Sequence, residues 1–282
     1  MSQHRFKSRR FISLTVAAAA GAGLLVTGAF NAGAVNTGGS KADAAKAEIS
    51  LPPKNGGFDY QIGGAYTPPE GVDIVSRDHT AKPADKLYNI CYVNAFQTQP
   101  GAEGEWEDDL LLRDDNGDVV YDGKWKEAVL DTRTDDKRKR IAEKVNGWID
   151  DCASKGFQAV EPDNLDTYDR FDQLDAEGAK ALSKRLADHA HSKGLAIAQK
   201  NTSELAEARD ELGTDFAVAE ECGHWEECGS YAEAYDDRVV VIEYGAEGME
   251  RACSGWKDRL SIVKRDENVT PEGDPEHVRE TC

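Results

Sequence analysis

The feature that most constrains the fold is the alternation of short apolar runs with longer amphipathic segments along residues 55–282. The short runs have the length of buried strands, and the segments between them have the apolar spacing of helices that pack on a sheet. This alternation is typical of βα units wound around a parallel sheet. The candidate strands are residues 59–63, 88–93, 128–131, 157–161, 195–199, 215–220, 239–243 and 260–264, of which 128–131 is the shortest and least β-branched. Eight strands predict an α/β fold, a single-domain (β/α)₈ TIM-like barrel.

Two intervening segments, residues 135–154 and 175–192, have a clear helical pattern. In the second, apolar residues recur at spacings of three and four, so one face can pack on the barrel, and Lys193-Gly194 supplies a stop. Residues 110–121 carry Asn-Gly between apolar stretches, which predicts a β-hairpin inserted between the second and third strands.

The first 34 residues have the pattern of an export signal. Four basic residues precede an apolar run over residues 11–29, and small residues around Ala34 provide a cleavage site. The alternative is an uncleaved anchor, and the Arg9-Arg10 pair leaves the choice between general and twin-arginine export open. Residues 35–54 are predicted to be a flexible linker before a domain at 55–282, and the mature protein is expected to be secreted.

Six cysteines in an exported chain predict up to three disulfides, because oxidising compartments preserve them. Six cysteines allow 15 pairings, and only Cys222 with Cys228 is close enough in sequence to indicate a local bridge. A zinc site is the alternative, but no spacing is CxxC and no histidine stands at ligand spacing.

The formal charge is -19, and removal of the four basic signal residues, -19 - 4, takes it to -23. Such a field repels nucleic acid and anionic membranes, so neither is an expected partner. The charge is explained either by solubility outside the cell or by a polycationic substrate.

Carboxylates collect at the predicted strand ends, where barrel enzymes place their active sites. Any one of them can instead cap a helix or pair with a cation such as Lys200. Acids at several strand ends on one rim favour function, since unneutralised carboxylates in one place cost stability. The rim residues are Glu161, Asp163, Asn164 and Asp166 after the fourth strand, Lys200 and Asn201 after the fifth, Glu220 and Glu221 after the sixth, and Glu243 and Tyr244 after the seventh.

Two carboxyls on either side of a bond are what glycoside hydrolysis requires, one as acid and one as nucleophile or base. The sequence contains no GxSxG, Walker, GxGxxG or HExxH motif. Carboxylate catalysis is therefore the predicted chemistry.

Five blocks of the sequence resemble the endo-α-1,4-polygalactosaminidase family, glycoside hydrolase family 114. They are residues 92–100, 156–166, 199–202, 215–222 and 242–244. The resemblance implies a TIM-like barrel, secretion, no required cofactor and hydrolysis of α-1,4-linked galactosamine polymers. Partly deacetylated polymers of that kind are cationic, so the expected partner is a cationic hexosamine polysaccharide.

The resemblance also implies that the catalytic acids are Asp163 and a glutamate of the 215–222 block. The family pattern favours Glu220. Strand parity favours Glu221, because Ala217 and Ala219 are small enough for a barrel interior and share its face. We retain Asp163 and Glu220 as the expected pair.

The remaining rim residues are expected to bind substrate or support the pair. They are Glu161, Asn164, Asp166, Lys200, Asn201, Glu221, Glu243 and Tyr244. The alternative function is a secreted barrel that binds polysaccharide without cleaving it. A metal-dependent deacetylase is disfavoured, because it would need a histidine and aspartate ligand set that the sequence does not offer.

Overall fold

The computed structural model describes residues 49–282, so the predicted signal sequence lies outside it. The described residues belong to one compact unit. Within the described residues, every helix is too short or too polar to cross a membrane. The predicted boundaries at residues 34 and 54 stay predictions.

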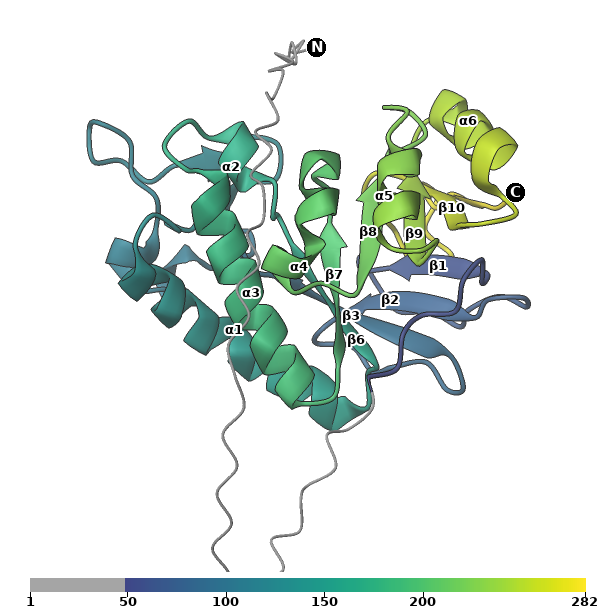
Figure 1. Cartoon of the computed structure of the whole chain (residues 1–282), viewed down its shortest axis with the longest axis horizontal. Coiled ribbons are helices and arrows are strands. Elements are labelled where there is room, and N and C mark those ends of the chain that lie inside the picture. Colours follow the sequence, from purple (N-terminus) through teal and green to yellow (C-terminus); the bar gives the residue numbers. More distant parts are fainter. Residues whose placement is uncertain (1–48) are drawn as a thin grey trace, which may run out of the picture. The chain divides into compact units, whose positions relative to one another are not determined.

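Eight parallel strands form one curled sheet, and a ninth short strand pairs antiparallel at its edge (Figure 1). This confirms the predicted eight-stranded α/β barrel class. In sheet order the strands are β1 (Phe58–Gln61), β2 (Ile74–Asp78), β3 (Tyr88–Asn94), β6 (Ala159–Asp163), β7 (Ala196–Lys200), β8 (Phe216–Glu220), β9 (Val239–Glu243), β10 (Ser261–Arg265) and β11 (Arg279–Glu280).

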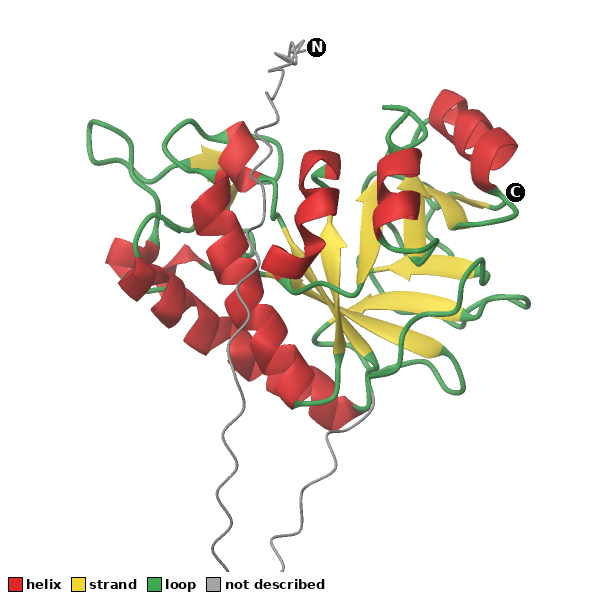
Figure 2. Cartoon of the chain, in the orientation of Figure 1, coloured by secondary structure: helices red, strands yellow, loops and turns green. Residues whose placement is uncertain are grey.

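Helices cover the outer face from β3 onward, whereas β1 and β2 are followed by loops (Figure 2). The two long helices, α1 and α3, match the predicted segments and begin at capping side chains of Thr134 and Asp175. The helices are α1 (Asp135–Lys155), α2 (Thr167–Arg170), α3 (Ala176–Ser192), α4 (Arg209–Leu212), α5 (Cys228–Ala234) and α6 (Ala246–Trp256), with 3₁₀ turns at Glu103–Glu105, Asp108–Leu110 and Ser203–Ala208.

Side chains join the two edges of the sheet where β1 lies beside β10. The Arg279 guanidinium donates to the carbonyl oxygen of Phe58 at 3.2 Å. The buried carboxylate of Asp59 lies 3.2 Å from Arg279 Nε and 3.7 Å from Arg265 Nη1, and it also accepts the Tyr66 hydroxyl at 2.9 Å. Ionic contacts therefore join the edges at the point where the other strands use backbone hydrogen bonds.

Strand β2 was not predicted, and residues 128–131, predicted as a barrel strand, lie outside the barrel. Only Ile74 and Val75 of β2 are apolar. Each face of the strand also carries a polar residue, Ser76 on the inner face and Arg77 on the outer face. The Arg77 side chain contacts polar loop and strand groups, including Gln61 Oε1 at 2.9 Å, where a helix would have demanded an apolar residue. The apolar periodicity on which the prediction depended is absent for that reason.

Residues 95–134 form an insertion between β3 and α1. It contains the two-stranded sheet of β4 (Tyr121–Asp122) and β5 (Glu127–Ala128), and the predicted Asn-Gly turn is closed by a bridge between Arg113 and Val119. Because β2 is a true barrel strand, the insertion follows the third barrel strand rather than the second.

Strand β6 is displaced two residues from the prediction and includes Pro162. Its pairing with β7 ends after Val160 opposite Ile197, whereas its pairing with β3 continues to Asp163 opposite Asn94. Proline has no N–H to give a ladder, so it fits where one neighbour is no longer hydrogen-bonded. The C-terminal ends of β6 and β7, beyond Val160 and Ile197, are therefore free to separate.

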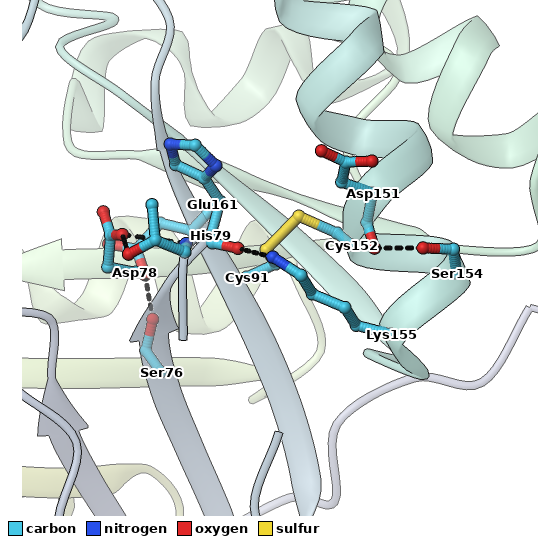
Figure 3. Close-up of a disulfide and its surroundings, with 10 residues drawn as sticks. Ser76, Asp78, His79, Cys91, Asp151, Cys152, Ser154, Lys155 and Glu161 are labelled. Carbon is cyan, nitrogen blue, oxygen red and sulfur yellow. Dashed lines mark hydrogen bonds between the residues drawn. A yellow bond between two sulfur atoms is a disulfide. The ribbon is translucent and has the colours of Figure 1, made fainter. Parts of the chain in front are cut away.

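All six cysteines are paired, which confirms the disulfide prediction and the local bridge within it, and which overturns the zinc alternative. Cys91 of β3 is joined to Cys152 of α1, so one bond fixes this helix against the sheet (Figure 3). The pairs are Cys91–Cys152, Cys222–Cys228 and Cys253–Cys282.

We expect the Cys91–Cys152 bridge to stabilise the fold more than the Cys222–Cys228 bridge. The pairs span 61 and 6 residues, and the chain-entropy account assigns them about 4 and about 2 kcal/mol of unfolding free energy. Equilibrium urea unfolding of the two double-alanine variants measures both losses. Equal losses, or the reverse order, would contradict this expectation.

Candidate active site

Each of three neighbouring strands is followed directly by a residue with the same left-handed backbone conformation. The residues directly after β6, β7 and β8 are Asn164, Asn201 and Glu221, with φ of 68°, 53° and 57°. Positive φ is tolerated by asparagine and strained for glutamate, and such strain collects at functional sites. In each case the chain turns away at once, and the last strand residue remains facing the barrel interior.

The buried ammonium of Lys200, the last residue of β7, lies at the centre of these strand ends. Lys200 is 1% exposed. Its Nζ lies 2.9 Å from Asp163 Oδ1, 3.2 Å from Glu161 Oε1, 3.4 Å from Glu220 Oε2 and 3.2 Å from the Tyr60 hydroxyl. Three carboxylates thus share one cation, and the cluster has a net negative charge.

Asp163 is held in its ionised form. Burial by itself raises the pKa of Asp163, but the Lys200 ammonium and the Tyr92 hydroxyl, which donates to Oδ2 at 2.7 Å, bring that pKa below its ordinary value. One carboxylate of the cluster is therefore an anion at neutral pH and is available as a nucleophile.

Glu161 lies beneath Asp163 and is completely buried. Its carboxylate accepts the hydroxyls of Tyr60 at 2.8 Å and of Ser76 at 2.6 Å (Figure 3) and contacts Lys200. Burial raises the pKa of Glu161. Solvent does not reach Glu161, so this side chain does not contact a substrate. Its ion pair with Lys200 holds the ammonium in place.

Glu220, the last residue of β8, is fixed on both sides. The Asn201 side-chain amide donates to Glu220 Oε2 at 3.1 Å and accepts the Glu220 backbone N–H at 2.9 Å. The Tyr244 hydroxyl donates to Oε1. About a quarter of the Glu220 side chain, 24%, is exposed, so it faces the open side of the cluster.

A pocket of about 300 Å³ opens above this cluster. Lys200 and Glu161 lie below its floor. Its lining includes Trp125 of the insertion and Glu267 of the segment after β10, and Lys124 joins these two segments through a 3.0 Å ion pair with Glu267. Of the predicted site residues, those that line the pocket are Asp163, Asn164, Asp166, Asn201, Glu220 and Tyr244.

Arg170 of α2 organises one side of the pocket and was not predicted. Its guanidinium forms ion pairs with Asp122 of the insertion and with Asp166 at 3.0 Å, and it donates to Asn164 Oδ1 at 2.9 Å. This cation is therefore already paired, with Asp166 of the pocket lining and with Asp122 of the insertion.

Two further pocket residues, Tyr92 and Glu127, were also missed. Tyr92 lies two residues after the inward-facing Ile90 on β3, so strand parity alone could have placed it. Glu127 lies on the insertion, and no local pattern indicates that this segment returns to the barrel rim.

Besides Glu161 and Lys200, two more of the predicted supporting residues, Glu221 and Glu243, do not line the pocket. Glu221 occupies the turn after β8. Glu243 faces the helices, and its Oε1 accepts the backbone N–H of Gly223 at 2.7 Å. Glu243 thus holds the loop that follows Glu220 and lies outside the pocket lining.

The parity argument for Glu221 rested on a wrong assignment of the barrel interior. Ala217 and Ala219 pack with Tyr231 of α5, so the small residues of β8 face the helix. Val218 packs in the interior with residues of β1 and β2, and Glu220 shares its face. The close helix packing explains why those two positions are alanine.

Comparison with known proteins gives a family match and two similar structures. The sequence profile of glycoside-hydrolase family GH114 matches residues 39–282. Aspergillus fumigatus Ega3, solved in complex with galactosamine, is 20% identical with a TM-score of 0.67, covering 83% of this chain and 98% of Ega3. The glycoside hydrolase domain of PelA from Pseudomonas aeruginosa is 14% identical with a TM-score of 0.53, covering 80% and 98%. These likenesses establish a shared fold. The comparison with curated protein sequences found no match.

We expect Lys200→Met to lower the free energy of unfolding by about 3–5 kcal/mol at neutral pH, because it leaves buried carboxylates without their cation. The folded-state pKa of Asp163 is lowered, so its stabilising contribution is present above the ordinary aspartate pKa and is lost as the pH falls. The difference in the free energy of unfolding between variant and wild type should therefore become smaller at acidic pH. Urea unfolding at a series of pH values measures this difference.

Lys184→Met is the matched control. Lys184 pairs with Asp188 on the exposed face of α3, and its side chain is 45% exposed. A surface pair contributes about 0–1 kcal/mol. If both variants lose the same stability at neutral pH, the Lys200 ammonium does not hold the cluster together.

Proposed function

Because the chain belongs to glycoside-hydrolase family GH114 and is therefore a glycoside hydrolase, we propose that it cleaves α-1,4-linked galactosamine polysaccharide with Asp163 and Glu220 as its carboxyl pair. The observation that carries this proposal is the single ammonium of Lys200, which lies within 3.4 Å of one oxygen of each carboxylate at the floor of the pocket.

The two carboxylates have different environments, and this difference assigns their roles. Asp163, kept ionised by Lys200 and Tyr92, attacks the anomeric carbon. Glu220, on the more open side, gives a proton to the departing glycosidic oxygen and then removes one from the water that releases the product. The negative charge left over in the cluster stabilises the positive charge that develops on the sugar ring.

The separation of the pair favours retention of the anomeric configuration. Lys200 Nζ lies 2.9 Å from Asp163 Oδ1 and 3.4 Å from Glu220 Oε2. These two carboxylate oxygens are therefore at most 6.3 Å apart (2.9 + 3.4). Inverting enzymes hold their carboxyls about 6.5 to 9.5 Å apart to admit a water, and retaining enzymes about 5 to 5.5 Å. A covalent glycosyl intermediate on Asp163 follows.

The charge of the molecule supports a cationic polymer as the substrate. The net charge of the whole chain is -19, and the pocket is lined by several carboxylates while its one lining cation, Arg170, is already paired. The structural relative Ega3 was solved with galactosamine, whose free amine is a cation. Three disulfides and the basic-then-apolar N-terminal sequence support export to an oxidising compartment.

We expect Asp163→Asn and Glu220→Gln each to lower kcat on de-N-acetylated α-1,4-galactosamine polymer by about 10²- to 10⁴-fold, the usual contribution of a positioned acid or base. New reducing ends per unit time are the measurement. Glu221→Gln is the matched control, since Glu221 lies one residue away but outside the pocket. The assignment of Glu220 fails if the control is the inactive variant.

The stereochemistry gives a second, independent test. Proton nuclear magnetic resonance of the first product formed should show the α-anomer before mutarotation, because two displacements at one carbon restore its configuration. Initial appearance of the β-anomer would instead require a water between the carboxylates and would refute the nucleophilic role of Asp163.

A further inference from the structure

Glu127 reaches the pocket from β5 of the insertion and approaches Asp163. The side-chain amide nitrogen of Asn164 lies 3.4 Å from Glu127 Oε2 and 3.5 Å from Asp163 Oδ2. The side-chain amide of Asn164 thus lies between the carboxylate of Glu127 and that of Asp163, the proposed nucleophile, and both carboxylates line the same pocket.

Among the acids that line the pocket, Glu127 and Asp78 have no cationic partner within the described residues, and Glu127 is the one that shares the Asn164 amide with Asp163. Asp163 and Glu220 share Lys200, and Glu267 pairs with Lys124. Asp166 pairs with Arg170, and Asp78 uses one oxygen to accept the backbone and hydroxyl hydrogens of Thr80.

The neighbours of Glu127 are neutral amides. Asn94 and Asn164 lie beside it, and the Gln97 side chain, oriented to satisfy both of its ends, donates to Glu127 Oε2 at 2.7 Å and accepts from Arg170 at 2.9 Å. Amide donors hold the carboxylate in place without supplying a countercharge, so its ionised form faces the pocket unneutralised.

We propose that Glu127 binds the protonated 2-amino group of the sugar whose anomeric carbon faces Asp163, and so selects amino sugar over N-acetylated sugar. This rests on the proposed function. In a hexosamine the amine stands on the ring carbon next to the anomeric carbon, so it lies beside the nucleophile. The carboxylate that is free to pair with it at that place is Glu127. An acetamide carries no positive charge and needs more space than an ammonium.

The electrostatic setting of Glu127 supports this assignment. Burial raises the pKa of Glu127 to about 7, and repulsion from Asp163 and Asp122 adds to the rise, against the opposing effects of Asn94 and Arg170. A cationic ligand would lower that pKa, so binding and ionisation reinforce each other. Below about pH 7 the free enzyme carries Glu127 protonated, and its preference for the amine is expected to weaken.

The experiment compares Glu127→Gln with wild type on two matched oligosaccharides, de-N-acetylated and N-acetylated α-1,4-linked galactosamine. Above pH 7, we expect the kcat/KM for the amine substrate to fall by about 10- to 100-fold in the variant, the loss typical of a hydrogen bond to a charged group. The value for the N-acetylated substrate should stay within about twofold. The variant should also lose the decline in amine preference that wild type shows in acid.

Glu105→Gln is the matched control, an equal charge change on an exposed residue of the same insertion outside the pocket, and Glu127→Asp should keep part of the preference. Equal losses on both substrates, or no loss, overturn the proposal. Calorimetric titration with galactosamine and with N-acetylgalactosamine separates it from the proposed function: wild type should bind the amine more tightly than Glu127→Gln does, even if no polymer is cleaved.

Discussion

One buried ammonium determines the arrangement of the site. Lys200 brings carboxylates from β6 and β8 to its own strand end, and without it three acids within a few ångströms would repel one another in a poorly solvated place. The cation is outnumbered, so the cluster keeps an excess of negative charge while each member stays fixed. A rim of this kind suits a reaction in which the substrate becomes positively charged.

The backbone makes room for that ammonium. Pairing between β6 and β7 stops at Val160, and Pro162 has no N–H to extend it. The Lys200 side chain, which faces the barrel interior, reaches Asp163 across these strand ends. The left-handed residues that follow β6, β7 and β8 turn the chain outward immediately above the reactive groups, and this leaves the rim open.

The sequence predicted the barrel class, α1, α3 and the acidic strand ends, because these depend on local periodicity and on the rule that parallel strands end at one rim. The prediction missed β2, whose outer face is polar, and it assigned the alanines of β8 to the wrong face because small residues also suit close helix packing. Glu127 could not be found in this way. Its place depends on how a long insertion folds back on the barrel, and no pattern within the segment encodes that contact.

The ion pair between Lys124 and Glu267 has a consequence for how a long polymer is engaged. The two side chains are 60% and 63% exposed, and such a pair contributes at most about 1 kcal/mol and weakens in salt. The insertion and the segment after β10 are thus joined by a contact that opens readily. On the proposed function, opening of this pair would let an internal stretch of the polymer enter from the side, without a free end having to thread through.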